Sequence, residues 1–254
     1  MIDFISKERY NYEDFVNVIE ILRAPGGCPW DREQTHQSIA RNFLEEVYEF
    51  LEAMEQDDPE HMCEELGDVL TQVVFHCNME QEAGRFTQED VCDMVCKKMI
   101  FRHPHVFGTV EVADSDEVLT NWDTLKMEEK HQQSYGDTLQ AVAKNLPSTW
   151  RAEKLVKKAS KAGFVWDDLP QATAKIQEEV TELTQSMDDP AEELGDVLFA
   201  TVSAAFVAGL DPEELLHQAC EKFTRRFVEM EQSATEPLDK LSKSQLLSLW
   251  NQKK

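Results

Sequence analysis

The chain of 254 residues contains one heptapeptide twice, and this repeat constrains its fold more than any other feature. Residues 64–70 read Glu-Glu-Leu-Gly-Asp-Val-Leu, and residues 192–198 repeat them without a change. A related block precedes each copy, Leu-Glu-Glu-Val-Tyr-Glu-Phe at 44–50 and Gln-Glu-Glu-Val-Thr-Glu-Leu at 177–183. Self-similarity of this kind indicates that one structural unit occurs twice in the chain.

The match between the two copies extends outward from these blocks. Both copies have a Trp-Asp pair, a Lys and an Arg four residues apart, and a late Trp. These stand at Trp30, Lys98, Arg102 and Trp122 in the first copy and at Trp166, Lys222, Arg226 and Trp250 in the second. We therefore predict two domains, residues 1–130 and 138–254, joined by a linker at 131–137 within a polar stretch.

Apolar residues recur every three or four positions on both sides of an Asp-Asp-Pro sequence in each copy. In the first copy they are Phe43, Val47, Phe50, Leu51 and Met54, then Leu66, Val69, Leu70, Val73 and Val74. This period favours two amphipathic helices, and Pro suits the first turn of the second one. Runs that could form strands are too short to build a sheet. The sequence thus predicts an all-α fold of two tandem helical-bundle repeats, each with a helical hairpin.

Composition excludes several classes of partner. The chain has 25 Lys and Arg against 50 Asp and Glu, a formal net charge of -25. Nucleic acid polymers and anionic membrane surfaces bind to basic footprints, so neither is an expected partner. No apolar run approaches the roughly 20 residues of a membrane span. The six cysteines form no Cys-x-x-Cys pair, which favours free thiols and a cytoplasmic protein.

Each predicted hairpin carries four carboxylates at helical spacing, so that all four can face one cleft. They are Glu46, Glu49, Glu65 and Asp68 in the first copy and Glu179, Glu182, Glu193 and Asp196 in the second. Acidic residues on a helix usually form a solvated face, but here they stand beside apolar positions and occur twice. Unpaired, such carboxylates repel one another, and Mg²⁺ would relieve that repulsion while sharing its ligands with substrate phosphates. We predict a metal site in each hairpin.

The order Glu-Glu-x-x-Glu, spacer, Glu-x-x-Asp resembles the signature of the MazG-type all-α nucleoside triphosphate pyrophosphohydrolases. The segments Gly27–Asp31 and Arg102–Phe107 and the two-copy layout extend the resemblance over nearly the whole chain. It implies Mg²⁺-dependent hydrolysis of a nucleoside triphosphate, ATP included, to the monophosphate and pyrophosphate, as nucleotide-pool housecleaning. It also implies a homodimer. One departure is the spacer, ten residues from Glu182 to Glu193 against fifteen from Glu49 to Glu65, which predicts a shallower second cleft.

The resemblance places substrate contacts in the second copy, which we therefore expect to be the main catalytic copy. There Glu179, Glu182, Glu193 and Asp196 would hold Mg²⁺. Glu178 is a candidate either for the base that accepts a proton from the attacking water or for a residue that orients this water from outside the metal ligands. The resemblance assigns nucleotide contacts to Lys222, Arg226 and Trp250. Lys222 and Arg226, one helical turn apart, could hold the outer phosphates, and the Trp250 indole could stack on the base. A helix-end charge and a packed terminal aromatic remain the alternatives for these residues.

Two other functions remain open at this point. One is a nucleotide-sensing regulatory protein with little turnover, and the other is a helical scaffold whose acidic clefts bind only a divalent cation. The first copy has its own complete carboxylate set, so its chemistry is open too. No Gly-x-x-x-x-Gly-Lys-[Ser/Thr] loop occurs, which excludes a P-loop hydrolase.

Overall fold

A computed structural model describes residues 4–129, 132, 134–185 and 190–252, and this part of the chain is helical without a strand. The chain divides into two compact units, Met1–Leu125 and Lys126–Lys254, here called unit 1 and unit 2. The all-α prediction is therefore confirmed, with one helical hairpin in each half. The predicted linker at 131–137 lies partly outside the described residues, and the exact domain boundaries stay a prediction.

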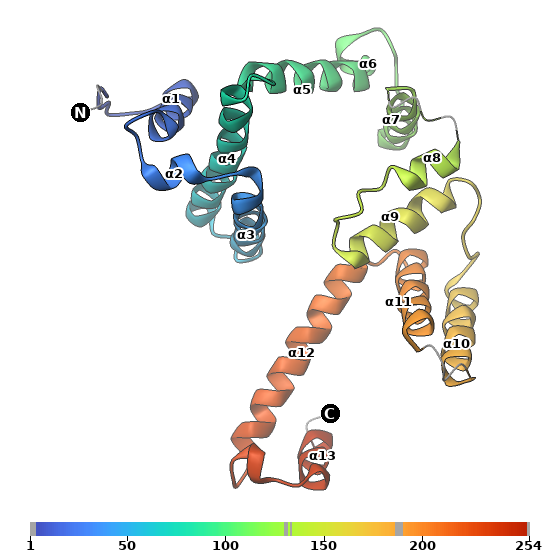
Figure 1. The fold of residues 1–254 in the computed structure, drawn as a ribbon. Coiled ribbons are helices and arrows are strands. Elements are labelled where there is room, and N and C mark those ends of the chain that lie inside the picture. Colours follow the sequence, from blue (N-terminus) through green and yellow to red (C-terminus); the bar gives the residue numbers. More distant parts are fainter. Residues whose placement is uncertain (1–3, 130–131, 133, 186–189, 253–254) are drawn as a thin grey trace. The chain divides into compact units, whose positions relative to one another are not determined.

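Unit 1 is built from a helical hairpin with shorter helices before and after it (Figure 1). Its elements in chain order are α1 (Tyr12–Arg23), α2 (Pro29–Glu33), α3 (His36–Glu55), α4 (Pro59–Glu82), α5 (Gln88–Arg102), α6 (Pro104–Phe107) and α7 (Ser115–Glu129). Helices α3 and α4 form the hairpin, and the division between the units falls within α7.

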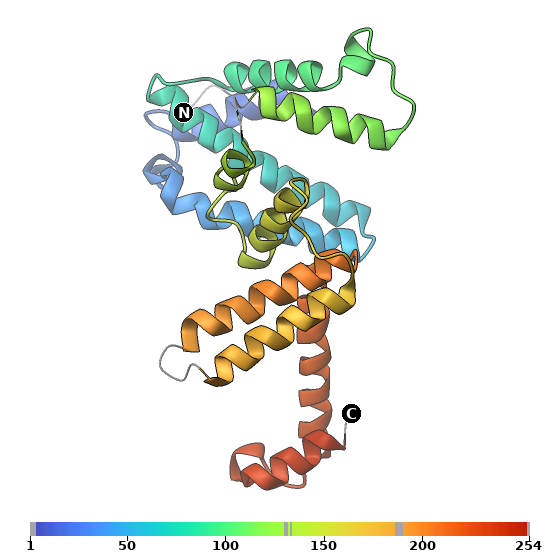
Figure 2. The ribbon, with the colours of Figure 1, turned by 90° about the vertical axis from the view of Figure 1, so that its right-hand side faces the viewer.

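Unit 2 repeats this order with a long helix after its hairpin (Figure 1). Its elements are α8 (Tyr135–Gln140), α9 (Ser148–Ser160), α10 (Leu169–Gln185), α11 (Pro190–Val207), α12 (Pro212–Ser233), the 3₁₀ helix η1 (Leu238–Lys240) and α13 (Lys243–Asn251). Helices α10 and α11 form the hairpin and correspond to α3 and α4. Figure 2 shows the two helices of this hairpin side by side along their length.

The turn of the first hairpin has the capping geometry that the sequence predicts. Asp58 is the N-cap of α4, and its Oδ1 atom accepts hydrogen bonds from the backbone N–H groups of Glu60 and His61. Pro59 follows at the first helical position, and Asp57 has a positive φ of 52°, which reverses the chain. In the second hairpin Pro190 begins α11, while Asp188 and Asp189 lie outside the described residues.

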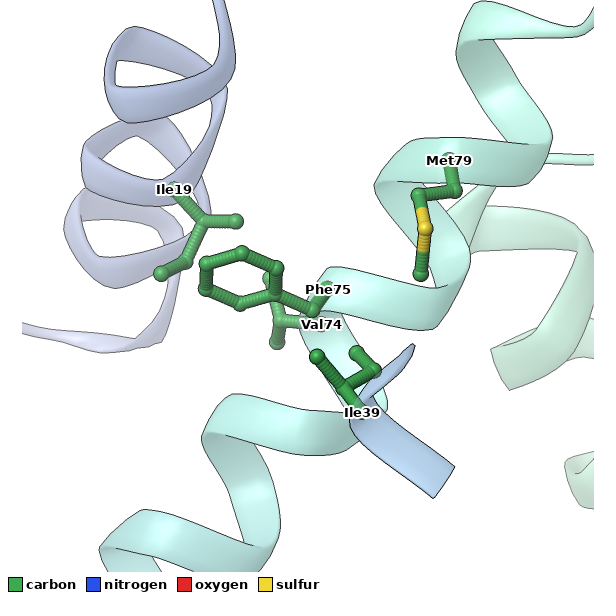
Figure 3. Close-up of a cluster of buried hydrophobic side chains, with 5 residues drawn as sticks. All are labelled: Ile19, Ile39, Val74, Phe75 and Met79. Carbon is green, nitrogen blue, oxygen red and sulfur yellow. The ribbon is translucent and has the colours of Figure 1, made fainter. Parts of the chain in front are cut away.

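The hydrophobic core of unit 1 lies where α1 crosses the start of α3 and the second half of α4. Its buried members are Ile19, Ile39, Val74, Phe75 and Met79. Figure 3 shows Ile19 of α1 pointing at the Phe75 ring of α4, with Ile39 of α3 beside Val74. This cluster fixes α1 against the hairpin at the end away from the Asp-Asp-Pro turn.

Among the described residues no single helix has the length and apolarity of a membrane span. Helices α11 and α12 meet such a criterion only when they are taken together, and they are bent by 110° at the break between them.

Candidate metal centres and an adjoining pocket

The carboxylates of the first hairpin converge as the sequence predicts. Glu46 and Glu49 on α3 and Glu65 on α4 can each offer a carboxylate oxygen such that all of these atoms lie within 4.8 Å of one another. Burial, followed by the negative charges of Asp68 and Glu49, raises the pKa of Glu46 above its usual range. The effect of Asp68 on this pKa indicates that its carboxylate lies near the same cluster.

The Glu65 carboxylate of this cluster has a partner for only one of its two oxygens among the described residues. Its residue surface is only 7 % exposed, and its Oε1 atom lies 2.9 Å from Nε2 of His61. Its other oxygen, Oε2, is buried and has no hydrogen-bond partner among the described residues. An unpartnered buried carboxylate oxygen is costly, and a hard divalent cation is the ligand that suits it. His61 was not recognised in the sequence, although its position four residues before Glu65 puts both on one helical face.

The second hairpin brings three of its four predicted ligands together in the same way. Carboxylate oxygens of Glu179 and Glu182 on α10 and of Glu193 on α11 can lie within 4.8 Å of one another. Glu193 stands in the first turn of α11, as its distance from Pro190 predicts. Burial and the charge of Glu179 raise the pKa of Glu182. The shorter spacer therefore does not separate these three carboxylates.

Asp196, the fourth predicted ligand, lies with Glu179 and Lys175 in the lining of a pocket of about 490 Å³. The rest of this unit 2 pocket is largely apolar, with walls from α8, α9, α10, α11 and the loop before α10. Its other lining residues are Leu139, Leu155, Val156, Ala159, Gly163, Phe164, Val165, Trp166, Phe199, Ala200 and Ser203. The sequence did not reveal this pocket, because its residues come from five separate segments.

Lys175 is a charged residue of this site that the sequence reasoning missed. Its Nζ atom lies 2.7 Å from Oε1 of Glu178 and 2.8 Å from Oε1 of Glu179. These two hydrogen bonds raise the pKa of Lys175 well above its usual range. The candidate base Glu178 is exposed and paired with this lysine. The only signal in the sequence was the spacing of Lys175, four residues before Glu179.

The predicted substrate contacts form a second group on α12 and α13. The guanidinium carbon of Arg226 lies 4.1 Å from the ring centre of Trp250, and one of its nitrogens donates to the Trp250 carbonyl at 3.3 Å. The Arg226 Nε atom is buried and unpartnered among the described residues, whereas Lys222 is exposed. In unit 1 the corresponding Arg102 lies 5.6 Å from the ring centre of Trp122.

This group does not meet the carboxylates of its own hairpin. Helix α12 leads away from the α10–α11 hairpin, and α13 packs at the far end of α12 (Figures 1 and 2). Within one chain, therefore, the structure brings Arg226 to Trp250 and Glu179 to Glu193, but it does not join these two pairs into one site.

Comparison with known proteins identifies the family. Residues 34–107 and 170–230 match the MazG nucleotide pyrophosphohydrolase domain, one segment in each half of the chain. A nucleoside triphosphate pyrophosphohydrolase of Escherichia coli K12 is 42% identical over 224 residues, which cover 85% of each chain. The nucleoside triphosphate pyrophosphohydrolase/pyrophosphatase MazG of Thermotoga maritima is 40% identical over 224 residues, covering 87% of this chain and 86% of the relative.

A more distant relative is the nucleoside triphosphate pyrophosphohydrolase of Mycobacterium tuberculosis, 30% identical over 239 residues, which cover 93% of this chain and 67% of that protein. Both matched segments contain a hairpin with a convergent acidic cluster. The family resemblance that the sequence motifs indicated is thus confirmed, and the chain belongs to the MazG nucleotide pyrophosphohydrolase family.

Proposed function

We propose that this chain is a Mg²⁺-dependent nucleoside triphosphate pyrophosphohydrolase. Water attacks the α-phosphorus of the substrate, and the products are a nucleoside monophosphate and pyrophosphate. The observation that carries the proposal is the convergence of Glu179, Glu182 and Glu193 beside a pocket of about 490 Å³. The family membership and the names of the relatives support the same activity.

The residues present fit a hard divalent cation. Carboxylate oxygens are the ligands that Mg²⁺ prefers, and the buried oxygen of Glu65 has no other partner in the described structure. In unit 2 we assign Glu179, Glu182, Glu193 and Asp196 as the ligands, and in unit 1 Glu46, Glu49, Glu65 and Asp68. When bound, Mg²⁺ neutralises phosphate charge and lowers the pKa of coordinated water.

Unit 2 is the main catalytic copy in this proposal, because its cluster adjoins the pocket. Glu178 serves as the base that accepts a proton from the attacking water. Lys175 hydrogen-bonds to both Glu178 and Glu179 and so holds the candidate base beside a ligand of the cation. The same lysine lines the pocket, so its charge also faces the place where phosphates would enter.

The remaining substrate contacts come from a second copy of the chain. Lys222, Arg226 and Trp250 lie apart from the cluster of their own unit, so a homodimer can bring them to the partner's cluster. Support for association comes from apolar side chains on the α10–α11 hairpin that are between 43% and 68% exposed. These are Val180, Leu194, Leu198 and Phe199. Exposed apolar groups that gather on one element favour a protein interface.

The physiological role in this proposal is removal of unwanted nucleoside triphosphates, ATP among the possible substrates, in the cytoplasm. The six cysteines are free thiols in the structure, as expected for a reducing compartment. With a net charge of -25, the chain is not expected to bind nucleic acid polymers or anionic membranes.

The test is a panel of nucleoside triphosphates incubated with the protein and Mg²⁺, with products separated by ion exchange. The expected products are monophosphate and pyrophosphate in equal amounts. Orthophosphate release would exclude the proposed reaction, and nucleotide binding without turnover would instead support a regulatory protein.

Two single substitutions then locate the working copy. Glu179→Gln should lower kcat by at least about a hundredfold, because it removes a ligand of the catalytic cation. Glu46→Gln should retain most activity. Glu64→Gln removes the charge of an exposed neighbour of Glu65 and serves as the control. If Glu46→Gln lowers kcat more than Glu179→Gln does, unit 1 and not unit 2 is the main catalytic copy.

A further inference from the structure

Helix α12, which carries Lys222 and Arg226, is held by its own unit at its two ends (Figure 1). Every residue from 214 to 225 is exposed, so the middle of the helix lies mostly in solvent. At the far end Arg226 contacts Trp250 of α13, and at the near end α12 packs against α9 and α11. The direction in which α12 leaves the bundle is therefore set in its first turn.

A side-chain hydrogen bond joins this first turn to α9. The hydroxyl group of Thr149, the second residue of α9, donates to Oε2 of Glu213, the second residue of α12. Both side chains are half-buried, and Pro212 beside them is buried. Asp211 completes the junction by accepting hydrogen bonds from the backbone N–H groups of Glu213 and Glu214. The Thr149–Glu213 contact thus connects two helices that are otherwise separated by the whole α10–α11 hairpin.

Unit 1 has an equivalent hydrogen bond formed by different residues. Helices α1 and α9 begin equally far before the Trp-Asp pair of their copies, and α5 and α12 begin equally far before the shared Lys. The Nε2 atom of Gln88, the first residue of α5, donates to the hydroxyl oxygen of Tyr12, the first residue of α1. In unit 2 the bond lies one position further along both helices. Both copies therefore join the start of the helix before the hairpin to the start of the helix after it.

The length of α12 converts a small change at this junction into a large displacement of the basic residues. From Glu213 to Arg226 the helix extends roughly 20 Å, so a tilt of about 10° at its base moves Arg226 by roughly 3 Å. Hydrogen bonds to phosphate oxygens need about 2.7–3.2 Å between heavy atoms, so such a displacement breaks them. The acidic cluster lies on α10 and α11 and does not move with α12.

We infer that Thr149 and Glu213 are positioning residues, whose hydrogen bond fixes the direction of α12 and so places Lys222 and Arg226 at the outer phosphates of the substrate. This inference rests on the proposed function, which assigns those two cations to the triphosphate. Neither Thr149 nor Glu213 touches the substrate in this assignment. The hydrogen bond therefore acts on triphosphate binding, while the chemical step at the acidic cluster is unchanged.

The first experiment compares variants with and without the hydroxyl group. Thr149→Val keeps the shape of the side chain but cannot donate, so KM for a triphosphate should rise about five- to tenfold while kcat stays within about twofold. Thr149→Ser keeps the donor and should stay within about twofold of wild type in both constants. Thr173→Val, at an exposed position of α10, is the matched control. An unchanged KM for Thr149→Val, or a fall in kcat without a rise in KM, would overturn the inference.

The second experiment asks which part of the nucleotide loses its contacts. One probe is an adenosine triphosphate analogue with a methylene bridge between the α and β phosphorus atoms, which resists hydrolysis, and the other is adenosine monophosphate, which has no outer phosphates. In equilibrium dialysis with Mg²⁺, Thr149→Val should bind the analogue about five- to tenfold more weakly and the monophosphate as tightly as wild type does. Equal weakening of both ligands would show a general structural effect and refute a positioning role.

Substitutions of Glu213 test the same hydrogen bond from α12 and decide the question if Thr149→Val does not fold. Glu213→Gln and Glu213→Leu both remove a charge from the first turn of α12, but only glutamine keeps an oxygen that can accept from Thr149. Glu213→Leu should bind the analogue about five- to tenfold more weakly than Glu213→Gln, and equal binding by the two would count against the inference.

Hydrolysis of triphosphates by the wild-type chain is measured in parallel. Its absence would refute the proposed function, whereas analogue binding does not depend on turnover and reports on the position of α12. A failure of the function and a failure of the positioning role therefore give different results.

Discussion

The Nζ atom of Lys175 lies 2.8 Å from a carboxylate oxygen of Glu179, so the unit 2 cluster already has a cation of its own. Glu179 is the most deeply buried acid of this cluster, with 7 % of its surface exposed. The lysine and an incoming divalent cation therefore compete for the same carboxylate. In unit 1 the corresponding position is Asn42, which carries no charge.

Replacement of this lysine should separate metal affinity from substrate affinity. In Lys175→Met the carboxylate of Glu179 loses its competing partner, so Mn²⁺ should bind about 3–10 times more tightly in the absence of nucleotide. KM for triphosphates should rise about tenfold, because a positive charge beside the phosphates is lost. Mn²⁺ titration by electron paramagnetic resonance and steady-state kinetics measure the two effects. Lys157→Met, at an exposed position on α9, is the control, and weaker Mn²⁺ binding by Lys175→Met would refute the competition.

The first acidic cluster should make thermal stability depend on divalent cations. The pKa of Glu46 is raised by burial and by its neighbours Asp68 and Glu49, so its ionised form destabilises the folded state at neutral pH. Glu46→Gln should therefore raise Tm by about 2–4 °C in metal-free buffer and reduce the further increase caused by Mg²⁺. Differential scanning calorimetry with and without Mg²⁺ checks both effects. A lower Tm for the metal-free variant would contradict this account.

A different carboxylate, Glu80, should stabilise the fold in a pH-dependent way. The Glu80 carboxylate accepts hydrogen bonds from Arg85 and one from His36, and these lower the pKa of Glu80 to about 2. A lowered pKa in the folded state means that the stabilisation is complete above the pKa of the unfolded chain, about 4.3, and is lost as the pH falls toward 2.

Glu80→Gln should accordingly lower the urea midpoint at pH 7, and its difference from wild type should shrink steadily below about pH 4.3. Unfolding followed by circular dichroism at a series of pH values measures this difference. Glu64→Gln, at an exposed position on the same helix, should show little change at any pH. A difference for Glu80→Gln that is constant down to pH 2 would show that its effect is not electrostatic.

The separation of Arg226 from the unit 2 cluster predicts complementation between chains. If Arg226 of one copy serves the carboxylates of another, Glu179→Gln and Arg226→Ala should each be nearly inactive alone. When the two variants are mixed, dissociated and allowed to reassemble, half of the dimers should contain one chain of each kind. Each such dimer has one site with both Glu179 and Arg226 intact, so the mixture should recover roughly a quarter of wild-type activity. Arg225→Ala, at the exposed neighbouring position, should remain active. A mixture no more active than its components would place the whole site within one chain.

Much of the fold and of both clusters follows from short-range features of the sequence. The repeated Glu-Glu-Leu-Gly-Asp-Val-Leu fixes the helical register, so Glu65 and Asp68 had to lie one turn apart, and Asp58 and Pro59 mark the turn between the helices. Convergence of Glu46 with Glu65 then follows from the hairpin alone.

The pocket and the position of the basic segment depend on packing between distant segments. Ser203 and Ala159 are ordinary small residues on helices, and only the fold shows that they face one cavity beside Glu179. Likewise, the repeat places Arg226 and Trp250 in the same copy. The sequence does not predict that α12 leads away from the α10–α11 hairpin and so separates these residues from the acidic cluster. Lys175 was visible as a neighbour of Glu179, although the same spacing also occurs in solvated ion pairs.

The Phe75 ring that fills the centre of unit 1 also has a consequence for the order of unfolding. Its contact with Ile19 joins α1 to the hairpin through buried apolar side chains. In unit 2 the position equally far from the repeated heptapeptide is Ser203, which lines the pocket of about 490 Å³. Close-packed interiors resist local opening, and hollow ones open more readily. Amide hydrogens of α4 near Phe75 should therefore exchange with solvent more slowly than those of α11 near Ser203. A bound nucleotide should reduce this difference in exchange rate.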